Sequence, residues 1–259
     1  MRLGRVLLRF WGTALSAELE YRSNFWVAGL ASLGNLFGSG FSLWLFYDKG
    51  GGFPGWSFDE GLLVLGLFSM FVGLVQMLLM PNLSRIVQHV ENGTLDFVLL
   101  KPLDSQLQVS LRVLSPWGLP DVVLGCGLIV VGGARAGVVP QNALLAILPL
   151  LSAAVILYSL WFVVATTSVW FVKIYNATEV LRGLLDAGRF PVQAYPPAYR
   201  FVFTFVVPIT FLTTVPADVL RGRAQPALLA AGPILAAALL FCSRLFWRRA
   251  LRSYTGASG

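Results

Sequence analysis

Long apolar stretches alternate with short polar segments along this chain. The apolar stretches cover about residues 24–47, 61–80, 109–133, 142–172 and 227–247. Each is about as long as the roughly 20 residues that a helix needs to cross the hydrocarbon core of a bilayer. Most of them lack the polar face that a helix of a soluble protein turns toward water. The pattern therefore predicts an all-α integral membrane protein.

The segment before the last apolar stretch allows two arrangements. Residues 174–190 form a helix that carries charges, whereas the apolar run Phe201–Val215 has only 15 residues and contains Pro208. Either Phe201–Val215 crosses the membrane, or 174–190 crosses and Phe201–Val215 folds back as a re-entrant element. Both arrangements give the same number of crossings, so hydropathy alone leaves the choice open.

Basic residues near both ends of the chain predict its topology. Short cytoplasmic segments of membrane proteins carry an excess of Lys and Arg. Here arginines cluster before the first apolar stretch and after the last, which places both termini in the cytoplasm and makes the number of crossings even. The connection 82–108 is then cytoplasmic as well. We therefore expect six transmembrane helices within residues 24–247, followed by a basic cytoplasmic tail, 248–259.

Residues 1–23 have a basic amphipathic pattern rather than that of a signal peptide. Arg2, Arg5 and Arg9 alternate with apolar residues at helical spacing, and no uninterrupted apolar core follows them. Such a helix lies in the headgroup plane of a membrane, with Phe10 and Trp11 toward the acyl chains. The alternative is a cytosolic helix that packs on the protein itself.

The composition agrees with a membrane protein and narrows the possible partners. Of the 259 residues, 57% are hydrophobic and 12% are charged, which is about half the charged fraction of a soluble domain. The net charge is +7, but the basic residues lie mostly at the termini and in loops. There they set the topology and contact anionic headgroups. We therefore expect membrane lipid as a partner and no nucleic acid.

The sequence contains no motif for catalysis or for nucleotide hydrolysis. It has no G-x-x-x-x-G-K-[ST] loop, because the glycine run at residues 50–52 is not followed by Lys and Ser or Thr. It also has no G-x-S-x-G, H-E-x-x-H or C-x-x-C motif, and His89 is its only histidine. We therefore expect a non-catalytic chain, with no metal site and no cofactor of its own.

The cytoplasmic connection 82–108 contains a candidate docking helix. Asn92-Gly93 ends a helix that extends from the second apolar stretch, because both residues tolerate the left-handed conformation. A second, short helix follows, which Thr94 is expected to cap and Pro102 to end. Its apolar face consists of Leu95, Val98 and Leu99. Such a helix either inserts into a groove of a partner or lies on the membrane, and the pattern favours neither.

Two motifs of the chain resemble a known family. Gly93-Thr94-Leu95-Asp96, followed by Leu99-Leu100-Lys101-Pro102-Leu103, resembles the G-T-L-D…L-L-K-P-L signature of a group of bacterial type-2 ABC permeases. A later segment resembles the proline-spaced part that precedes the last helix of these permeases. It contains Phe190-Pro191, Tyr195-Pro196, Arg200, Pro208 and Val215-Pro216-Ala217. With the amphipathic start and the six-helix plan, the resemblance covers nearly the whole chain.

The resemblance implies a permease subunit of an ABC exporter for an amphiphilic or hydrophobic substrate. It implies that an ATPase on a separate chain binds ATP and Mg²⁺, and that a second permease, either a sister chain or another copy, completes the transporter. The location would be the bacterial cytoplasmic (inner) membrane. Residues 190–217 would form the re-entrant region. The coupling helix, carried over to this chain, would contact the ATPase through Thr94, Leu95, Asp96, Val98, Leu99, Leu100, Lys101 and Pro102.

Four charged residues are candidates for lining a translocation path. Glu179, Arg182 and Asp186 share one face of a helix, since they are spaced at i, i+3 and i+7. They either line the path or include a self-neutralising Glu179–Arg182 pair near the membrane boundary. Asp121 lies alone in the third apolar stretch. It either lines the path or accepts hydrogen bonds inside the bundle.

Two other classes of function compete with an ABC permease. An ion-coupled secondary transporter predicts an internal repeat and charges in broken helices at the middle of the membrane, and the halves of this chain show no convincing repeat. A membrane-embedded lipid-modifying enzyme would have to work with Glu179, Asp186 and a single histidine. Association with an ATPase would separate the permease from both.

Overall fold

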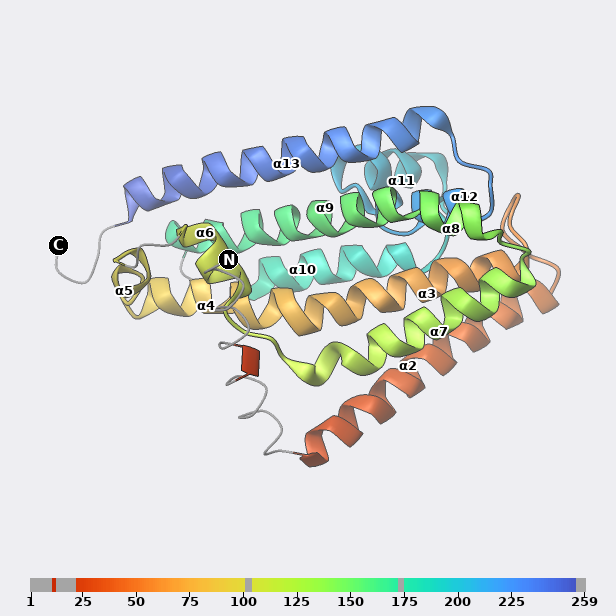
Figure 1. The fold of residues 1–259 in the computed structure, drawn as a ribbon, viewed down its shortest axis with the longest axis horizontal. Coiled ribbons are helices and arrows are strands. Elements are labelled where there is room, and N and C mark those ends of the chain that lie inside the picture. Colours follow the sequence, from red (N-terminus) through yellow and green to blue (C-terminus); the bar gives the residue numbers. More distant parts are fainter. Residues whose placement is uncertain (1–10, 13–21, 101–103, 172–174, 255–259) are drawn as a thin grey trace.

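The computed structural model describes residues 11–12, 22–100, 104–171 and 175–254 of the chain. Within these residues every regular element is helical, and the long helices lie side by side in an elongated bundle (Figure 1). The predicted all-α class is therefore confirmed.

The long helices are α2 (Arg22–Asp48), α3 (Phe58–Leu74), α4 (Met80–Glu91), α7 (Leu119–Arg135), α9 (Ile147–Thr166), α10 (Tyr175–Leu185) and α13 (Pro226–Ser253). The short α-helices are α5 (Asp96–Leu99), α6 (Ser105–Leu111), α8 (Pro140–Leu145), α11 (Pro197–Phe201) and α12 (Thr214–Leu220). Turns of 3-10 or π-helix join them: η1 (Val75–Leu79), η2 (Pro116–Gly118), η3 (Thr167–Val169), η4 (Asp186–Arg189), η5 (Val192–Ala194), η6 (Val202–Val206) and η7 (Ile209–Phe211).

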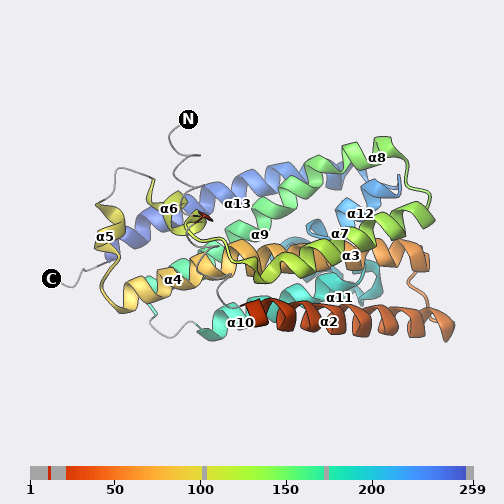
Figure 2. The ribbon, with the colours of Figure 1, turned by 60° about the horizontal axis from the view of Figure 1, so that its bottom comes forward.

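The bundle has two distinct ends. At one end lie α5, α6 and the C-terminal part of α13, and at the other lie α8, α12 and the connection between α2 and α3 (Figures 1 and 2). We call these the α5 end and the α12 end. The connection 82–108 and the last turns of α13 are thus at the same end, as expected if both are cytoplasmic.

Within the described residues, four helical segments are long and apolar enough to cross a membrane: Phe58–Glu91, Pro116–Arg135, Pro140–Val169 and Pro226–Ser253. A fifth candidate is the pair Pro197–Val206 and Ile209–Leu220, which is bent by 75° and is either a broken span or a re-entrant loop. The bend lies within the apolar run that contains Pro208. The last helix continues to Ser253, so the predicted tail 248–259 begins as helix.

The second membrane helix is longer at both ends than the apolar stretch predicts. It begins at Phe58 because Ser57 and Glu60 form a capping box, each side chain bonding the backbone N–H of the other. It continues through Pro81, in agreement with the predicted helix that extends from this stretch to Asn92-Gly93. A π-helical turn, η1, precedes Pro81, and the carbonyl of Met77, four residues before the proline, accepts the N–H of Ser115 instead. The helix therefore continues through α4 to Glu91.

Glycines set the close contact between α3 and α7. A Cβ atom on Gly118 would lie 2.1 Å from the carbonyl oxygen of Gly73, and one on Gly125 would lie 2.6 Å from that of Gly66. Both distances are far below van der Waals contact, so these two backbones approach each other only because side chains are missing. The asparagine Asn82 extends the contact to the α5 end, since its buried side chain bonds both the N–H and the carbonyl of Val113.

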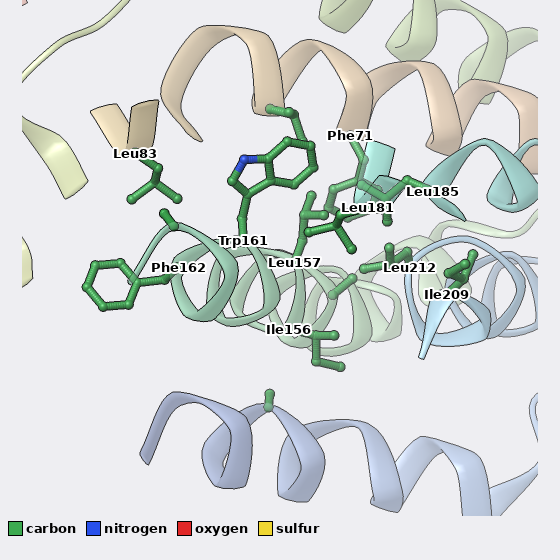
Figure 3. Packing of buried hydrophobic residues seen from close by; sticks show 14 of the residues in the cluster. Phe71, Leu83, Ile156, Leu157, Trp161, Phe162, Leu181, Leu185, Ile209 and Leu212 are labelled. Atoms are coloured by element: carbon green, nitrogen blue, oxygen red, sulfur yellow. The ribbon is translucent and has the colours of Figure 1, made fainter. Parts of the chain in front are cut away.

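The larger of two hydrophobic clusters is centred on α9. Figure 3 shows Leu157 and Trp161 on the side of α9 that faces α3, where they meet Phe71, Leu181 and Leu185. On the opposite side, α9 packs along α13. The second cluster lies toward the α12 end and joins the α2–α3 connection to α12. In contrast, α2 contacts only α3, α7 and η2 extensively.

The predicted interfacial helix, residues 1–23, falls mostly outside the described residues. Trp11 is described, and its indole N–H donates to the carbonyl of Leu111 at 3.0 Å.

Candidate functional site

A short helix at the α5 end forms the first candidate site. Asn92 ends α4 and Gly93 follows with a φ of +63°, so this pair reverses the chain as predicted. The predicted cap at Thr94 is wrong: α5 has no side-chain cap, and the Thr94 hydroxyl lies 2.8 Å from Nδ1 of His89 in α4. Helix α5 begins at Asp96, one residue later than expected, although Leu95 already has helical dihedral angles.

The apolar residues of α5 divide between two surfaces. Leu95 and Val98 are buried against the larger core cluster and hold the turn in place. Phe97 is 70% exposed and Leu100 80% exposed, whereas Leu99 is exposed only to 37%. The predicted face of Leu95, Val98 and Leu99 is therefore mostly an anchoring face. We call the exposed pair Phe97 and Leu100 the docking tip.

Sequence reasoning missed Phe97. The available signal was its spacing of three from Leu100, which places both on one side of a helical turn. Asp96 and Thr94 are partly buried beside the docking tip. Lys101 and Pro102 lie outside the described residues.

Helix α6 ties this region to α9 and α13. Asp104 caps α6 by accepting the N–H of Leu107, and it also pairs with Arg244 of α13. Burial raises the pKa of Asp104, but the Leu107 N–H and the Arg244 guanidinium outweigh burial and hold that pKa below its ordinary value. Trp247 donates to Ser105 at 3.0 Å, which adds a second link to α13.

A polar network continues from α6 into the bundle. The amide of Gln106 donates to the hydroxyls of Tyr158 in α9 and Ser243 in α13, at 3.2 and 3.3 Å. Ser110 also lies 2.9 Å from the Tyr158 hydroxyl. A displacement of α5 and α6 would therefore act directly on α9 and α13.

A polar cleft in the side of the bundle forms the second candidate site. It has a volume of about 160 Å³ and lies among α2, the α3–η1 segment, α9 and the α10–η4 segment. Its apolar wall includes Phe71, Val75, Leu157 and Trp161. Its polar lining consists of Asn35, Gln76, Arg182, Asp186 and Thr213.

Two of the four candidate path residues, Arg182 and Asp186, line this cleft directly. Glu179 points elsewhere: it is exposed and lies 3.9 Å from Arg182, as the self-neutralising alternative expects. Asp121 is buried behind the cleft, where its carboxylate accepts a hydrogen bond from Gln76 at 3.1 Å. The structure thus places two of these charges in the cleft, Asp121 behind it and Glu179 outside it.

Arg189 connects the cleft to α2. It bonds Asp186 at 3.3 Å, donates to the hydroxyl of Ser39 at 3.1 Å and lies over the ring of Phe68. Its Nε atom is buried and has no hydrogen-bond partner in the described part of the chain, and the same holds for the hydroxyl of Thr213. Two polar atoms in and beside the cleft are therefore unsatisfied.

The α12 end is closed by a buried ion cluster. Arg221 pairs with Asp218 at 2.6 Å and with Glu60 at 3.2 Å, and its guanidinium lies 3.6 Å from the centroid of Trp56. It also donates to the carbonyl of Gly55 at 2.7 Å. The cluster joins the α2–α3 connection to α12.

Comparison with known proteins identifies the family. The sequence matches the family described as "ABC-2 family transporter protein" over residues 33–258, which includes the α5 region, the cleft and the bent pair of helices. Searches of curated proteins and of solved structures gave no match. Because the match covers most of the chain, this protein belongs to the ABC-2 transporter family and is a multi-pass permease.

Proposed function

We propose that this chain is the transmembrane subunit of an ATP-driven exporter of an amphiphilic or hydrophobic substrate, and that an ATPase on another chain drives it. The observation that carries the proposal is the docking tip. Phe97 and Leu100 expose large apolar side chains at the end where the last turns of α13 carry Arg248, Arg249 and Arg252. Exposed apolar side chains of this kind mark an interaction surface.

The docking tip is the coupling contact in this proposal. Phe97 and Leu100 enter a groove of the ATPase, while Leu95 and Val98 fix α5 to the bundle. When ATP closes the ATPase, the movement passes from α5 through Asp104 and Gln106 to α13 and α9. Nucleotide and Mg²⁺ bind to the partner chain only.

Six crossings follow if α2 and α10 both span the membrane. Helix α2 has 27 residues, enough for about 40 Å at the 1.5 Å rise of a helix. It exposes Trp26, Phe37 and Phe41 and buries Ser32 and Ser39. Polar groups toward the bundle and aromatic rings outward are the arrangement of a membrane helix. The bent pair then forms the re-entrant region within 190–217.

A second permease, a sister chain or a second copy, completes the transporter. Helix α2 contacts few other elements of its own chain and leaves an apolar face open. We expect this face to contact lipid and the second permease, in the bacterial cytoplasmic membrane with both termini in the cytoplasm.

Co-purification tests the coupling contact. The full chain is expressed with its candidate ATPase, and the ATPase retained on the membrane subunit is measured. We expect Phe97→Asp to reduce the retained ATPase about tenfold or more, since it places a charge in an apolar groove. Phe97→Leu is the matched control and should retain it. Equal retention by Phe97→Asp and the unmodified chain would refute the proposed contact.

A further inference from the structure

The cleft has the size of a head group rather than of a whole lipid. Its volume is about 160 Å³, whereas one water takes about 30 Å³ of the liquid. Its lining includes the polar side chains of Arg182 and Asp186 as well as the apolar ones of Phe71, Leu157 and Trp161. A molecule with a compact polar head and an apolar continuation matches both kinds of wall.

The cleft presents both signs of charge at once. Arg182 and Asp186 are spaced at i, i+4 along the α10–η4 segment and both line the cavity. Arg182 and Asp186 do not form an ion pair with each other. Arg182 instead lies 3.9 Å from Glu179, and Asp186 lies 3.3 Å from Arg189. A ligand with a single charge would approach one favourable and one unfavourable partner. A ligand with both charges can satisfy both.

Unsatisfied polar atoms also indicate a missing partner. Thr213 is only 2% exposed and lines the cleft, yet its hydroxyl has no hydrogen-bond partner among the described residues. The buried Nε atom of Arg189, next to Asp186, is in the same condition. A buried polar group without a partner costs free energy that a bound polar ligand would recover.

We infer that this cleft binds the zwitterionic head group of an amphiphile, with its cationic group beside Asp186 and its anionic group beside Arg182. The inference rests on the proposed transport function and specifies its substrate class. Thr213 supplies a hydroxyl to the head group, and the apolar wall at Leu157 and Trp161 receives the first carbons of the tail.

Photo-crosslinking of the full chain in detergent tests this assignment. Three probes share one tail with a diazirine near the head: a phosphocholine, a phosphoglycerol and a trimethylammonium amphiphile. Crosslinked peptides are identified by mass spectrometry. We expect the phosphocholine probe to label the α9 and α10–η4 peptides about tenfold more than either of the others. Equal labelling by all three would mean that any tail fills the cleft, and it would overturn the inference.

Charge variants sharpen the result. Arg182→Gln should abolish the preference over the trimethylammonium probe, and Asp186→Asn the preference over the phosphoglycerol probe. Arg182→Lys and Asp186→Glu keep the charges and should keep most of the preference, which separates a charge effect from misfolding. The pair of the exposed Arg135 and the partly exposed Asp59, 3.8 Å apart near the α12 end, provides matched controls: Asp59→Asn and Arg135→Gln should change nothing.

The same preparations report on the transport proposal separately. If the ATPase is retained but the three probes label equally, only the zwitterion assignment fails. If the phosphocholine preference and its charge dependence are present but no ATPase associates, the site stands and the ATP-driven mechanism fails.

Discussion

At the scale of single residues, the bundle places its charges where other groups neutralise them. Arg221 shows this at the α12 end, where its side chain is 8% exposed and that of Asp218 is 9% exposed. The pair with Glu60 and the stacking on Trp56 surround the guanidinium on several sides. Such a cluster is sensitive to the loss of one member, because the remaining charges stay buried without a partner.

Replacing this arginine should therefore destabilise the fold. Arg221→Met keeps most of the side-chain volume but removes the buried cation between Asp218 and Glu60. The exposed Arg223, 3.8 Å from Glu60, is then the nearest remaining cation in the described residues. Removing one partner of a buried ion pair costs about 3–5 kcal/mol, which corresponds to a decrease of roughly 10 °C in the thermal unfolding midpoint of a chain of this size. The measurement is thermal unfolding of the purified chain in detergent.

The matched control is Arg135→Met. Arg135 forms an exposed pair with Asp59 at 3.8 Å, and exposed pairs contribute about 1 kcal/mol or less. If Arg221→Met unfolded at the temperature of the unmodified chain, the cluster would have no structural role.

Residue identities alone indicated some of these sites and not others. The Asn92-Gly93 helix stop is a local signal, because both residues favour the left-handed conformation wherever they occur, and the structure confirms it. The exposure of Phe97 is not local. It depends on which side of α5 Leu95 and Val98 turn toward the core, and that is set by α4, α6 and α9 together.

At the scale of elements, the apolar pattern located the helices well and their ends less well. The stretch at 61–80 became a continuous helical segment of 34 residues, because a π-helical turn accommodates Pro81 and Ser115 uses the carbonyl that the proline leaves free. The close contact between α3 and α7 could not be predicted from the apolar pattern either. It needs glycines in register on both segments. Gly73 of α3 lies opposite Gly118, the residue before α7, and this becomes visible only once the two segments are paired.

The link between α6 and α13 should depend on pH. The folded pKa of Asp104 lies below its ordinary value, so its charged form stabilises the folded state. That contribution is fully present above the ordinary aspartate pKa of about 3.9. It disappears as the pH falls through the lower, folded pKa. The difference in unfolding midpoint between the unmodified chain and Asp104→Asn should therefore be constant at higher pH and shrink below about pH 4.

Arg244→Gln serves as the second variant. Because Arg244 is the cation that pairs with Asp104, its loss should reduce the effect of Asp104→Asn in the double variant. The part that depends on the Leu107 N–H should remain. A difference that grew on acidification would mean that Asp104 is destabilised, rather than stabilised, in its charged form.

At the scale of the whole molecule, the two ends differ in how they are built. The α12 end is closed by the Arg221 cluster and by the contact of Asn142 with the carbonyl of Leu220 at 3.1 Å. The α5 end has the docking tip and the basic last turns of α13. The side of the bundle between them has the cleft. In the proposed mechanism, the α5 end receives the mechanical work and the α12 end, held by the Arg221 cluster, faces outward.

This orientation is testable by labelling with a membrane-impermeant thiol reagent. Cys126 and Cys242 are both exposed, so both are first replaced by serine, and each test cysteine is introduced into that variant. Gln225, at the start of α13, and Gln88, in α4, are exposed at opposite ends of the bundle. The basic residues of α13 and of the connection 82–108 predict that the α5 end is cytoplasmic, so Gln225→Cys should react in intact cells. Gln88→Cys should react only after permeabilisation. If only Gln88→Cys were labelled in intact cells, the orientation would be the reverse of the predicted one. The docking tip would then lie outside the cell, without access to an ATP-hydrolysing partner.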